Sequence, residues 1–232
     1  MRSPSPIVPS SASHPSGLVL PRRKFLTAAA AVPLAAWSVP GAWADMLTAT
    51  PRQTEGPFYP DSLPLDTDND LLRLNDASSP ADGEVAHFSG RVLSESGEPV
   101  RNALVEIWQC DASGVYIHSR GGPREKQDAN FQGFGRFLTG SDGRYYFRTI
   151  KPVAYGGRTP HIHVIVKQNG REVLTTQCYI KGEKRNRRDG IFKRTPQELR
   201  GLLTTAFEPL GDAAGQYAAD WDIVLGQTPS DA

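Results

Sequence analysis

The sequence predicts an all-β protein: an antiparallel β-sandwich with an irregular N-terminal arm and one short C-terminal helix. Short runs of alternating apolar and polar residues recur over residues 83–228, with turn-forming residues between them. Asp142-Gly143 and Asn169-Gly170 are the strongest of these turns, because Asp-Gly and Asn-Gly favour tight hairpins. A chain of 232 residues, 38% hydrophobic and 22% charged, is long enough for one globular domain with a substantial core.

Residues 1–44 are expected to precede this domain as an export signal. They contain no Asp or Glu, and they join Arg22-Arg23 to an Ala-rich apolar run over residues 27–39 and to a small-x-small pattern at Ala42-Trp43-Ala44. These features are typical of a twin-arginine signal. We therefore expect a periplasmic or secreted protein whose signal is cleaved after Ala44. Prolines interrupt the apolar run, so we expect no stable membrane anchor, which would need about 18 apolar residues.

Loss of the signal would also change the charge of the protein. The segment carries four positive charges and no negative ones, so the formal net charge would fall by four, from +1 to −3. A weakly acidic chain gives no reason to expect a nucleic-acid partner. The twin-arginine route exports folded proteins, often with a cofactor in place, which favours a metal site.

The elements follow in order after the signal. Residues 45–82 are rich in Pro, Asp and Ser and predict an irregular arm. Strands are expected over residues 84–94, 100–110, 135–139, 144–150, 162–168, 173–180 and 221–225. Thr195-Pro196-Gln197-Glu198 has the pattern of a capping box with proline at the first helical position, which predicts a helix as far as about residue 207.

The chain has two cysteines, Cys110 and Cys178, and both fall in expected strands. In an oxidising compartment they could pair, or they could remain separate buried thiols. The sequence lacks Cys-x-x-Cys, Gly-x-Ser-x-Gly and a phosphate-binding Gly-rich loop. Zinc ribbons, nucleophile-elbow hydrolases and P-loop enzymes are therefore poor candidates.

The residues richest in chemistry are Tyr155, Arg158 and the pair His161 and His163. Histidines two apart in a strand leave the same face and can reach one ion. Alone, the pair also fits two strand histidines hydrogen-bonded at a sheet edge, or a copper or zinc site. Tyr116 adds a second phenol, and two phenols with two imidazoles suit a hard, oxidised, non-haem iron.

At these residues the chain resembles the intradiol ring-cleavage dioxygenases, and particularly the protocatechuate 3,4-dioxygenase subunits. The matching blocks occur in the family's order and cover most of residues 84–182. They are Val105-Glu-Ile-Trp-Gln109, Gly114-Val-Tyr116, Gly135-Arg-Phe-Leu-Thr139, Asp142-Gly143, Phe147-Arg-Thr-Ile-Lys-Pro152, Tyr155, Arg158-Thr-Pro-His161-Ile-His163 and Thr176-Gln177. The resemblance implies a prealbumin-like β-sandwich as the catalytic domain over residues 83–228.

The resemblance also implies a reaction. Such enzymes are non-haem Fe(III) dioxygenases that use O2 to cleave a catechol-type ring between the two hydroxyl-bearing carbons, giving a cis,cis-muconate-type dicarboxylic acid. Matching positions make Tyr116, Tyr155, His161 and His163 the iron ligands. Tyr155 is further implied to leave the iron and take a proton from the substrate.

Arg158 and Gln177 match family positions beside the substrate ring. By resemblance, Arg158 is expected to stabilise negative charge that develops on the substrate during oxygen attack, and Gln177 to orient Arg158 or polarise a substrate oxygen. The link from Tyr155 to His161 is shorter than in the well-known enzymes, and Gly157 replaces an aromatic residue, so the substrate is less defined than the metal. Because this chain carries all four ligands itself, a homo-oligomer is the simplest expectation for its assembly.

Other interpretations remain open from the sequence. A non-catalytic, transthyretin-like β-sandwich binding module would share the Val-Glu-Ile-Trp block but would not require the tyrosines and histidines. His118 could be a fifth ligand, although a structural role is favoured. Trp108 and Tyr179 are expected to pack in the core. The basic run over residues 181–194 is expected to be a solvated loop, unless it steers a charged aromatic substrate.

Overall fold

The structure is a computed structural model that describes residues 46–74, 79–211 and 215–226. The chain divides into two units, residues 1–42 and 43–232, and every described residue belongs to the second. The expected export signal over residues 1–44 lies outside the described residues. Within the described part of the chain, no helix is long and apolar enough to cross a membrane.

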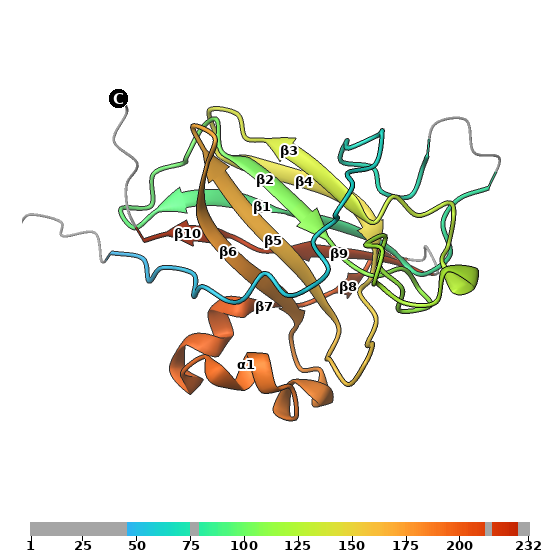
Figure 1. Cartoon of the computed structure of the whole chain (residues 1–232). Coiled ribbons are helices and arrows are strands. Elements are labelled where there is room, and N and C mark those ends of the chain that lie inside the picture. Colours follow the sequence, from blue (N-terminus) through green and yellow to red (C-terminus); the bar gives the residue numbers. More distant parts are fainter. Residues whose placement is uncertain (1–45, 75–78, 212–214, 227–232) are drawn as a thin grey trace, which may run out of the picture. The chain divides into compact units, whose positions relative to one another are not determined.

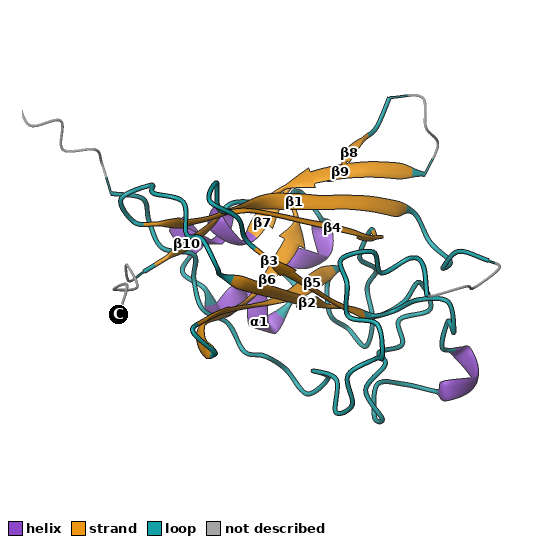
Figure 2. Cartoon of the chain, turned by 90° about the horizontal axis from the view of Figure 1, so that it is seen from above, coloured by secondary structure: helices purple, strands orange, loops and turns teal. Residues whose placement is uncertain are grey.

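Two five-stranded sheets pack face to face (Figures 1 and 2). The first sheet contains β1 (Val85–Ser94), β4 (Arg144–Ile150), β8 (Glu208–Pro209), β9 (Gln216–Asp220) and β10 (Ile223–Leu225). The second sheet, in the order β3-β2-β5-β6-β7, contains β2 (Leu104–Trp108), β3 (Phe134–Leu138), β5 (His161–Gln168), β6 (Arg171–Ile180) and β7 (Thr204–Thr205). The predicted all-β sandwich is confirmed.

The sheets are mixed rather than purely antiparallel, which corrects one part of that prediction. β1 pairs antiparallel with β4 but parallel with β9 and β10, and β6 pairs parallel with β7. Parallel pairing needs a long crossover, and the helical segment between β6 and β7 supplies one. β9 was not predicted, because Gln216-Tyr-Ala-Ala-Asp220 contains two alanines and no β-branched residue.

Alternation along the strands gives each sheet one face in a shared core. In β5, Ile162 and Val164 are fully buried in that core, while His161 and His163 leave the opposite face. Asn169-Gly170 closes the β5–β6 hairpin with φ angles of 49° and 72°, as a type I′ turn requires. The hairpin therefore fixes which face of β6 lies beside the histidines.

The C-terminal helical segment differs from the expected one. The α-helix α1 spans Gly190–Arg194, and the 3₁₀ helices are η1 (Arg124–Lys126), η2 (Lys184–Arg187) and η3 (Gln197–Leu203). Thr195 ends α1 instead of starting a helix, and its hydroxyl accepts a hydrogen bond from Gln53 at 3.1 Å. The side chain of Asp189 caps α1. The helix predicted after Thr195 is present as the 3₁₀ helix η3, which ends at Leu203 rather than near residue 207. The capping box is absent, since η3 has no side-chain cap and the Thr195 hydroxyl bonds to Gln53 instead.

The N-terminal arm crosses the outer face of the second sheet (Figure 1). The backbone N–H of Gln53 donates a hydrogen bond to the carbonyl oxygen of Thr175 in β6 at 2.9 Å. Further along, the Tyr59 hydroxyl donates to the buried Glu106 of β2 at 2.9 Å. The arm therefore covers the face from which the two histidines project.

Candidate metal centre

The histidine pair lies on β5, in the middle of the second sheet. β5 has β2 on one side and β6 on the other, so neither histidine is at a sheet edge. Trp108 of β2 stands opposite His163 and stacks on its ring, with centroids 4.6 Å apart and planes 12° apart. On β6, Tyr179 lies opposite His161, and Gln177 lies opposite His163. These side chains share the face that the arm covers.

Tyr116 reaches the same place from the loop that follows β2. The Asp111 carboxylate accepts a hydrogen bond from Val115 N at 2.9 Å, and Tyr116 N donates to Gly121 O at 3.0 Å. A Cβ at residue 121 would lie 2.4 Å from the Tyr116 carbonyl oxygen, so this close approach requires glycine. Phe58 of the arm stacks on the Tyr116 ring with centroids 5.1 Å apart.

Tyr155 and Arg158 form the two ends of a tight turn. Arg158 N donates to Tyr155 O at 2.6 Å, and the central residues Gly156 and Gly157 have φ angles of 50° and 82°. Two positive φ angles are typical of a type I′ turn, which favours glycine at both positions. The short link noted in the sequence is therefore a compact turn that holds Tyr155 and Arg158 side by side.

The four predicted ligands form one cluster, here called the donor cluster: Tyr116, Tyr155, His161 and His163. Nε2 of His161 lies 3.1 Å from Nε2 of His163, which lies 3.2 Å from the Tyr116 hydroxyl. The Tyr155 ring meets the Tyr116 ring edge to face with centroids 5.0 Å apart, and its centroid is 5.6 Å from that of His161. Residues separated by up to 47 positions in the sequence thus meet at one point.

The surroundings of the histidines fix how they present their nitrogens. Nδ1 of His161 lies 2.6 Å from Thr159 O. A carbonyl only accepts, so Nδ1 carries the proton and Nε2 carries the lone pair. Nδ1 of His163 is buried without a hydrogen-bond partner among the described residues. The Nε2 atoms of the two histidines face each other, and that of His161 presents a lone pair. A cation bound between them would satisfy this arrangement.

Burial keeps the donor cluster uncharged when no ion is bound. Burial, followed by the positive charge of Arg158, lowers the pKa of His161 to about 3, and burial holds the pKa of His163 well below its ordinary value. Burial raises the pKa of the Tyr155 phenol and, more strongly, that of the Tyr116 phenol. A bound trivalent cation would reverse this balance for the phenols, because it favours the ionised oxygen.

The donor cluster fits a small metal ion. Two ligands at right angles and about 2.1 Å from one ion lie about 3 Å apart, and the observed separations of 3.1 and 3.2 Å match this value. In the described ranges, no group of three or more His, Cys, Asp and Glu side chains is placed to hold a metal. A metal held here by more than the two histidines would also contact the two tyrosines.

His118 does not join the donor cluster. Its Nδ1 accepts a hydrogen bond from Arg120 N at 2.9 Å, and its Nε2 lies 3.9 Å from the Asp61 carboxylate. Both ring nitrogens therefore face partners outside the cluster, and the ring packs edge-on against Phe58. This geometry agrees with a structural role.

Three side chains hold Arg158 beside the donor cluster, and we call them the Arg158 network: Gln177, Tyr179 and Asp189. Nη2 of Arg158 donates to Gln177 Oε1 at 2.7 Å and lies 3.5 Å from the Tyr179 hydroxyl. Nε donates to Asp189 at 2.7 Å. The bond to Gln177 is the one expected if Gln177 orients Arg158. The Gln177 amide nitrogen in turn donates to Thr54 O of the arm at 2.9 Å.

Two members of the Arg158 network were not predicted as site residues. Tyr179 was expected only to pack, and it is fully buried, but its hydroxyl also donates to Gln53 at 2.7 Å. Asp189 was hidden in the basic run over residues 181–194. Its sequence signal is that an Asp directly precedes the start of α1, as is common for helix N-caps. Its long-range bond to Arg158 has no local signal.

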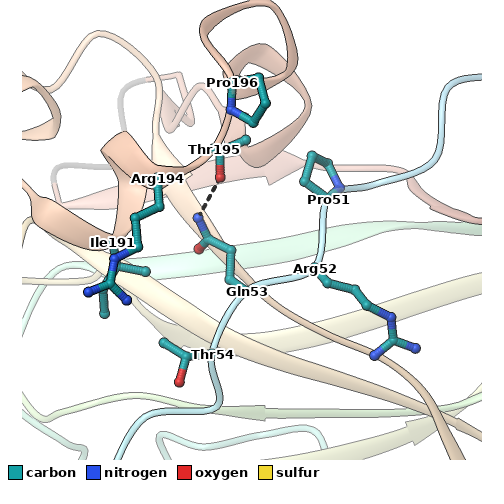
Figure 3. A pocket seen from close by; sticks show the side chains of 8 residues that line it. All are labelled: Pro51, Arg52, Gln53, Thr54, Ile191, Arg194, Thr195 and Pro196. Atoms are coloured by element: carbon teal, nitrogen blue, oxygen red, sulfur yellow. Dashed lines mark hydrogen bonds between the residues drawn. The ribbon is translucent and has the colours of Figure 1, made fainter.

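A pocket of about 340 Å³ lies between the arm and α1 (Figure 3). Residues 51–54 form one wall, and Ile191 with residues 194–196 forms the other. Gln53 connects this pocket to the Arg158 network through Tyr179, and Thr54 connects it through Gln177. The volume lies in the range of small-molecule sites, roughly 300–1,000 Å³.

Fold and geometry together define a class: a β-sandwich with two tyrosines and two histidines clustered on the outer face of one sheet. Residues 54–227 match a family model described as Dioxygenase. The chain is 38% identical over 188 residues to the protocatechuate 3,4-dioxygenase beta chain of Burkholderia cepacia, covering 75% of this chain and 78% of that one. Catechol 1,2-dioxygenase 2 of Acinetobacter lwoffii is 33% identical over 152 residues, and the chain spans only 52% of its length.

Solved structures show the same fold. The dioxygenase domain of a dioxygenase carbohydrate-binding protein fusion from Streptomyces sp. SirexAA-E has a TM-score of 0.61 and 31% identity, covering 78% of this chain and 100% of that one. An intradiol ring-cleavage dioxygenase from Tetranychus urticae has a TM-score of 0.60 at 20% identity, covering 77% of this chain and 95% of that one.

The chain belongs to the intradiol dioxygenase family, whose members are oxidoreductases. The matched residues 54–227 include the whole donor cluster and the whole Arg158 network. The family resemblance and the interpretation as an enzyme are therefore confirmed, which removes support from the non-catalytic binding module.

Proposed function

We propose that the protein is a non-haem Fe(III) dioxygenase that uses O2 to cleave a catechol-type ring between its two hydroxyl-bearing carbons. The product would be a cis,cis-muconate-type dicarboxylic acid. The observation that carries this proposal is the convergence of three ligand atoms. Nε2 of His163 lies 3.1 Å from Nε2 of His161 and 3.2 Å from the Tyr116 hydroxyl oxygen. Relatives named as protocatechuate and catechol dioxygenases support the same class of substrate.

The donor cluster would hold the iron. Ionised Tyr116 and Tyr155 would offset two of the three charges of Fe(III) and so favour the ferric state. Neutral His161 and His163 would complete the set, with their rings oriented by Thr159 O and Trp108. When bound, the ferric ion would withdraw electron density from a catecholate and prepare its ring for reaction with O2.

Tyr155 is suited to accept a proton from the substrate. A catechol that binds as a dianion must lose two protons, and the Tyr155 phenolate oxygen can hold one of them. Burial raises the pKa of this phenol when no ion is bound, so the phenolate oxygen would be a strong base once it is released from the cation. Tyr155 is also only partly buried, unlike Tyr116, so it has more room to change position as it takes up the proton.

Arg158 would stabilise negative charge that develops on the substrate. Its guanidinium stays charged at any working pH. Hydrogen bonds hold the guanidinium in place at Nε and Nη2. A donor oriented before the reaction needs no reorganisation when charge develops, which lowers the barrier.

The arm contributes a cover and the neighbouring pocket. Phe58 shields the Tyr116 ring from solvent, and a drier site strengthens the electrostatic effect of Arg158. The pocket between residues 51–54 and Ile191 is connected to the Arg158 network through Gln53 and Thr54 and would offer space for ring substituents. Its walls, rather than the metal ligands, would select among catechols.

We also propose that the protein is exported by the twin-arginine route, acts in the periplasm or outside the cell, and assembles as a homo-oligomer. Arg22-Arg23, the apolar run and Ala42-Trp43-Ala44 support the export proposal. Mass spectrometry of the exported protein should give an N-terminus at Asp45, and replacing both arginines with lysine should leave the precursor in the cytoplasm. Export of the doubly substituted protein would contradict this route.

Oxygen uptake with product identification tests the proposed reaction. Iron-loaded protein should consume one O2 per ring with at least one of catechol, protocatechuate, hydroxyquinol or a chlorocatechol, and both atoms of ¹⁸O2 should enter the product. Tyr146→Phe, on the other sheet, is the matched tyrosine control and should retain activity. Cleavage beside the diol, or no uptake by the fully iron-loaded protein across the panel, would contradict the proposal.

A further inference from the structure

The basic run over residues 181–194 contains one acid that turns inward. Asp189 has a side chain with no exposed surface, whereas the neighbouring Arg187 and Arg188 are exposed. The run therefore consists of a solvated basic surface with a buried carboxylate beneath it. A buried carboxylate is costly unless its oxygens find donors.

Both oxygens of Asp189 are satisfied, and the two serve different parts of the molecule. Oδ2 accepts from Arg158 Nε at 2.7 Å and from Thr159 N at 3.1 Å. Oδ1 accepts from Ile191 N at 3.0 Å and from Phe192 N at 2.9 Å. Only an ionised carboxylate can accept from all four donors, because an asparagine would turn an NH2 group toward one pair.

The first pair of bonds acts on the loop that carries Arg158 and leads to His161. Arg158 donates hydrogen bonds from Nε to Asp189 and from Nη2 to Gln177. Two bonds on different nitrogens fix the plane of a guanidinium, while one bond leaves it free to swing. Without Asp189, the orientation of Arg158 would depend on Gln177 and the longer contact with Tyr179, at 3.5 Å.

The second pair of bonds acts on α1, which forms one wall of the pocket. By capping α1, Asp189 sets the position of Ile191, whose side chain lines the pocket opposite Gln53 and Thr54 (Figure 3). The same carboxylate thus ties this wall to Arg158.

We infer that Asp189 is a positioning residue that holds the Arg158 guanidinium in its working orientation and fixes it relative to the α1 wall of the pocket. This inference rests on the proposed function for the role of Arg158. The positional part concerns Arg158 and α1 alone and can be measured without turnover.

Asp189→Ser separates the two roles of the carboxylate. Serine is a good helix N-cap, but it is too short to reach Arg158 as well. The crystal structure of Asp189→Ser should keep α1 and show Arg158 turned away from its wild-type plane. Iron content and the visible absorption band should be unchanged, because the donor cluster is intact. With the best catechol of the panel, kcat should fall about 10- to 100-fold, with a smaller change in the Kd for anaerobic substrate binding.

A double-mutant cycle tests whether Asp189 acts through Arg158. Adding Asp189→Ser to Arg158→Ala should lower kcat by less than about twofold beyond Arg158→Ala alone, since the group being positioned is already absent. Glu183→Gln is the matched control: it is the other acid of the basic run and caps only η2, so kcat should stay at the wild-type value.

Several results would overturn the inference. An unchanged Arg158 orientation or an unchanged kcat in Asp189→Ser would do so, as would a full additional loss in the Arg158→Ala background. Loss of iron or of folding in both Asp189→Ser and Asp189→Asn would show that Asp189 is structural instead. If the wild-type protein cleaves no catechol, the proposed function fails, and the crystal structures alone decide the positional claim.

Discussion

Nε2 of His161 faces Nε2 of His163 at 3.1 Å within a site where both side chains are 1% exposed. A proton on the His161 ring would be disfavoured by burial and by the positive charge of Arg158, and a proton on the His163 ring by burial. The pair is therefore stable as neutral imidazoles or as ligands of a shared ion. This relationship makes the site sensitive to pH.

We predict that the metal-free protein loses stability as the pH falls below about 6.5. In the folded protein the pKa of His161 is about 3 and that of His163 is well below its ordinary value, whereas both titrate near ~6.5 when unfolded. The unfolded chain then binds more protons, so this stability is fully present above the unfolded pKa and is lost as the pH falls from there. Each histidine can contribute a slope of up to about 1.4 kcal/mol per pH unit.

Urea unfolding of the metal-free protein at a series of pH values measures that slope. Replacing both His161 and His163 with asparagine should flatten it. A stability that is the same at about pH 7 and about pH 5 would contradict burial of the two histidines as neutral groups.

Trp108 should tolerate phenylalanine but not alanine. Its ring is fully buried and stacks on His163, yet its Nε1 has no hydrogen-bond partner among the described residues. Trp108→Phe loses no hydrogen bond and should cost roughly 1–2 kcal/mol of unfolding free energy, while Trp108→Ala leaves a cavity and should cost about 3–5 kcal/mol. Equal losses for the two variants in urea titrations would refute a packing role.

Gly121→Ala should weaken metal binding. A Cβ at this position would lie 2.4 Å from the Tyr116 carbonyl oxygen and 2.6 Å from the Tyr116 Cβ, so the backbone that presents the Tyr116 phenol must shift. We expect metal affinity to fall about 10- to 100-fold, as for changes that displace a ligand's support. Gly201→Ala is the control, because its added Cβ meets nothing within 4 Å. Competitive chelation measures the iron affinity of both variants. Equal affinities would show that the close approach at Gly121 does not hold the Tyr116 phenol in place for the metal.

The two cysteines should behave as free, protected thiols. Cys110 and Cys178 are both buried and unpaired with each other, and burial raises the pKa of Cys110 to about 12. A thiol reagent at neutral pH should label neither in the native protein and both after unfolding without reductant. Finding no thiol in the unfolded, unreduced protein would reveal a disulfide.

The sequence predicts most strands because their faces differ in polarity. β4 was expected over residues 144–150, which are its bounds in the structure, since Tyr145 and Phe147 are buried while Arg144 is exposed. The parallel pairing of β9 could not be predicted in this way, because pairing direction depends on where a distant segment returns. Thr195 shows the same limit, since its partner Gln53 lies 142 residues away.

The four members of the donor cluster could be predicted from the family resemblance, and the histidine pair from its spacing, but their convergence could not. His161 and His163 share a face by strand alternation alone, whereas the approach of Tyr116 depends on the Asp111 loop and on Gly121. Asp189 was missed for a related reason. A single acid among cations predicts a solvated surface, and only the folded chain brings it to Arg158, 31 residues away.

Iron content and the visible spectrum of the purified protein test the central claim most directly. We predict one iron per chain and a visible tyrosinate-to-iron absorption band. The band should weaken and shift in Tyr116→Phe and in Tyr155→Phe and stay unchanged in Tyr146→Phe. A protein that stays colourless after iron reconstitution, or a band that neither tyrosine substitution alters, would contradict a ferric centre at the donor cluster.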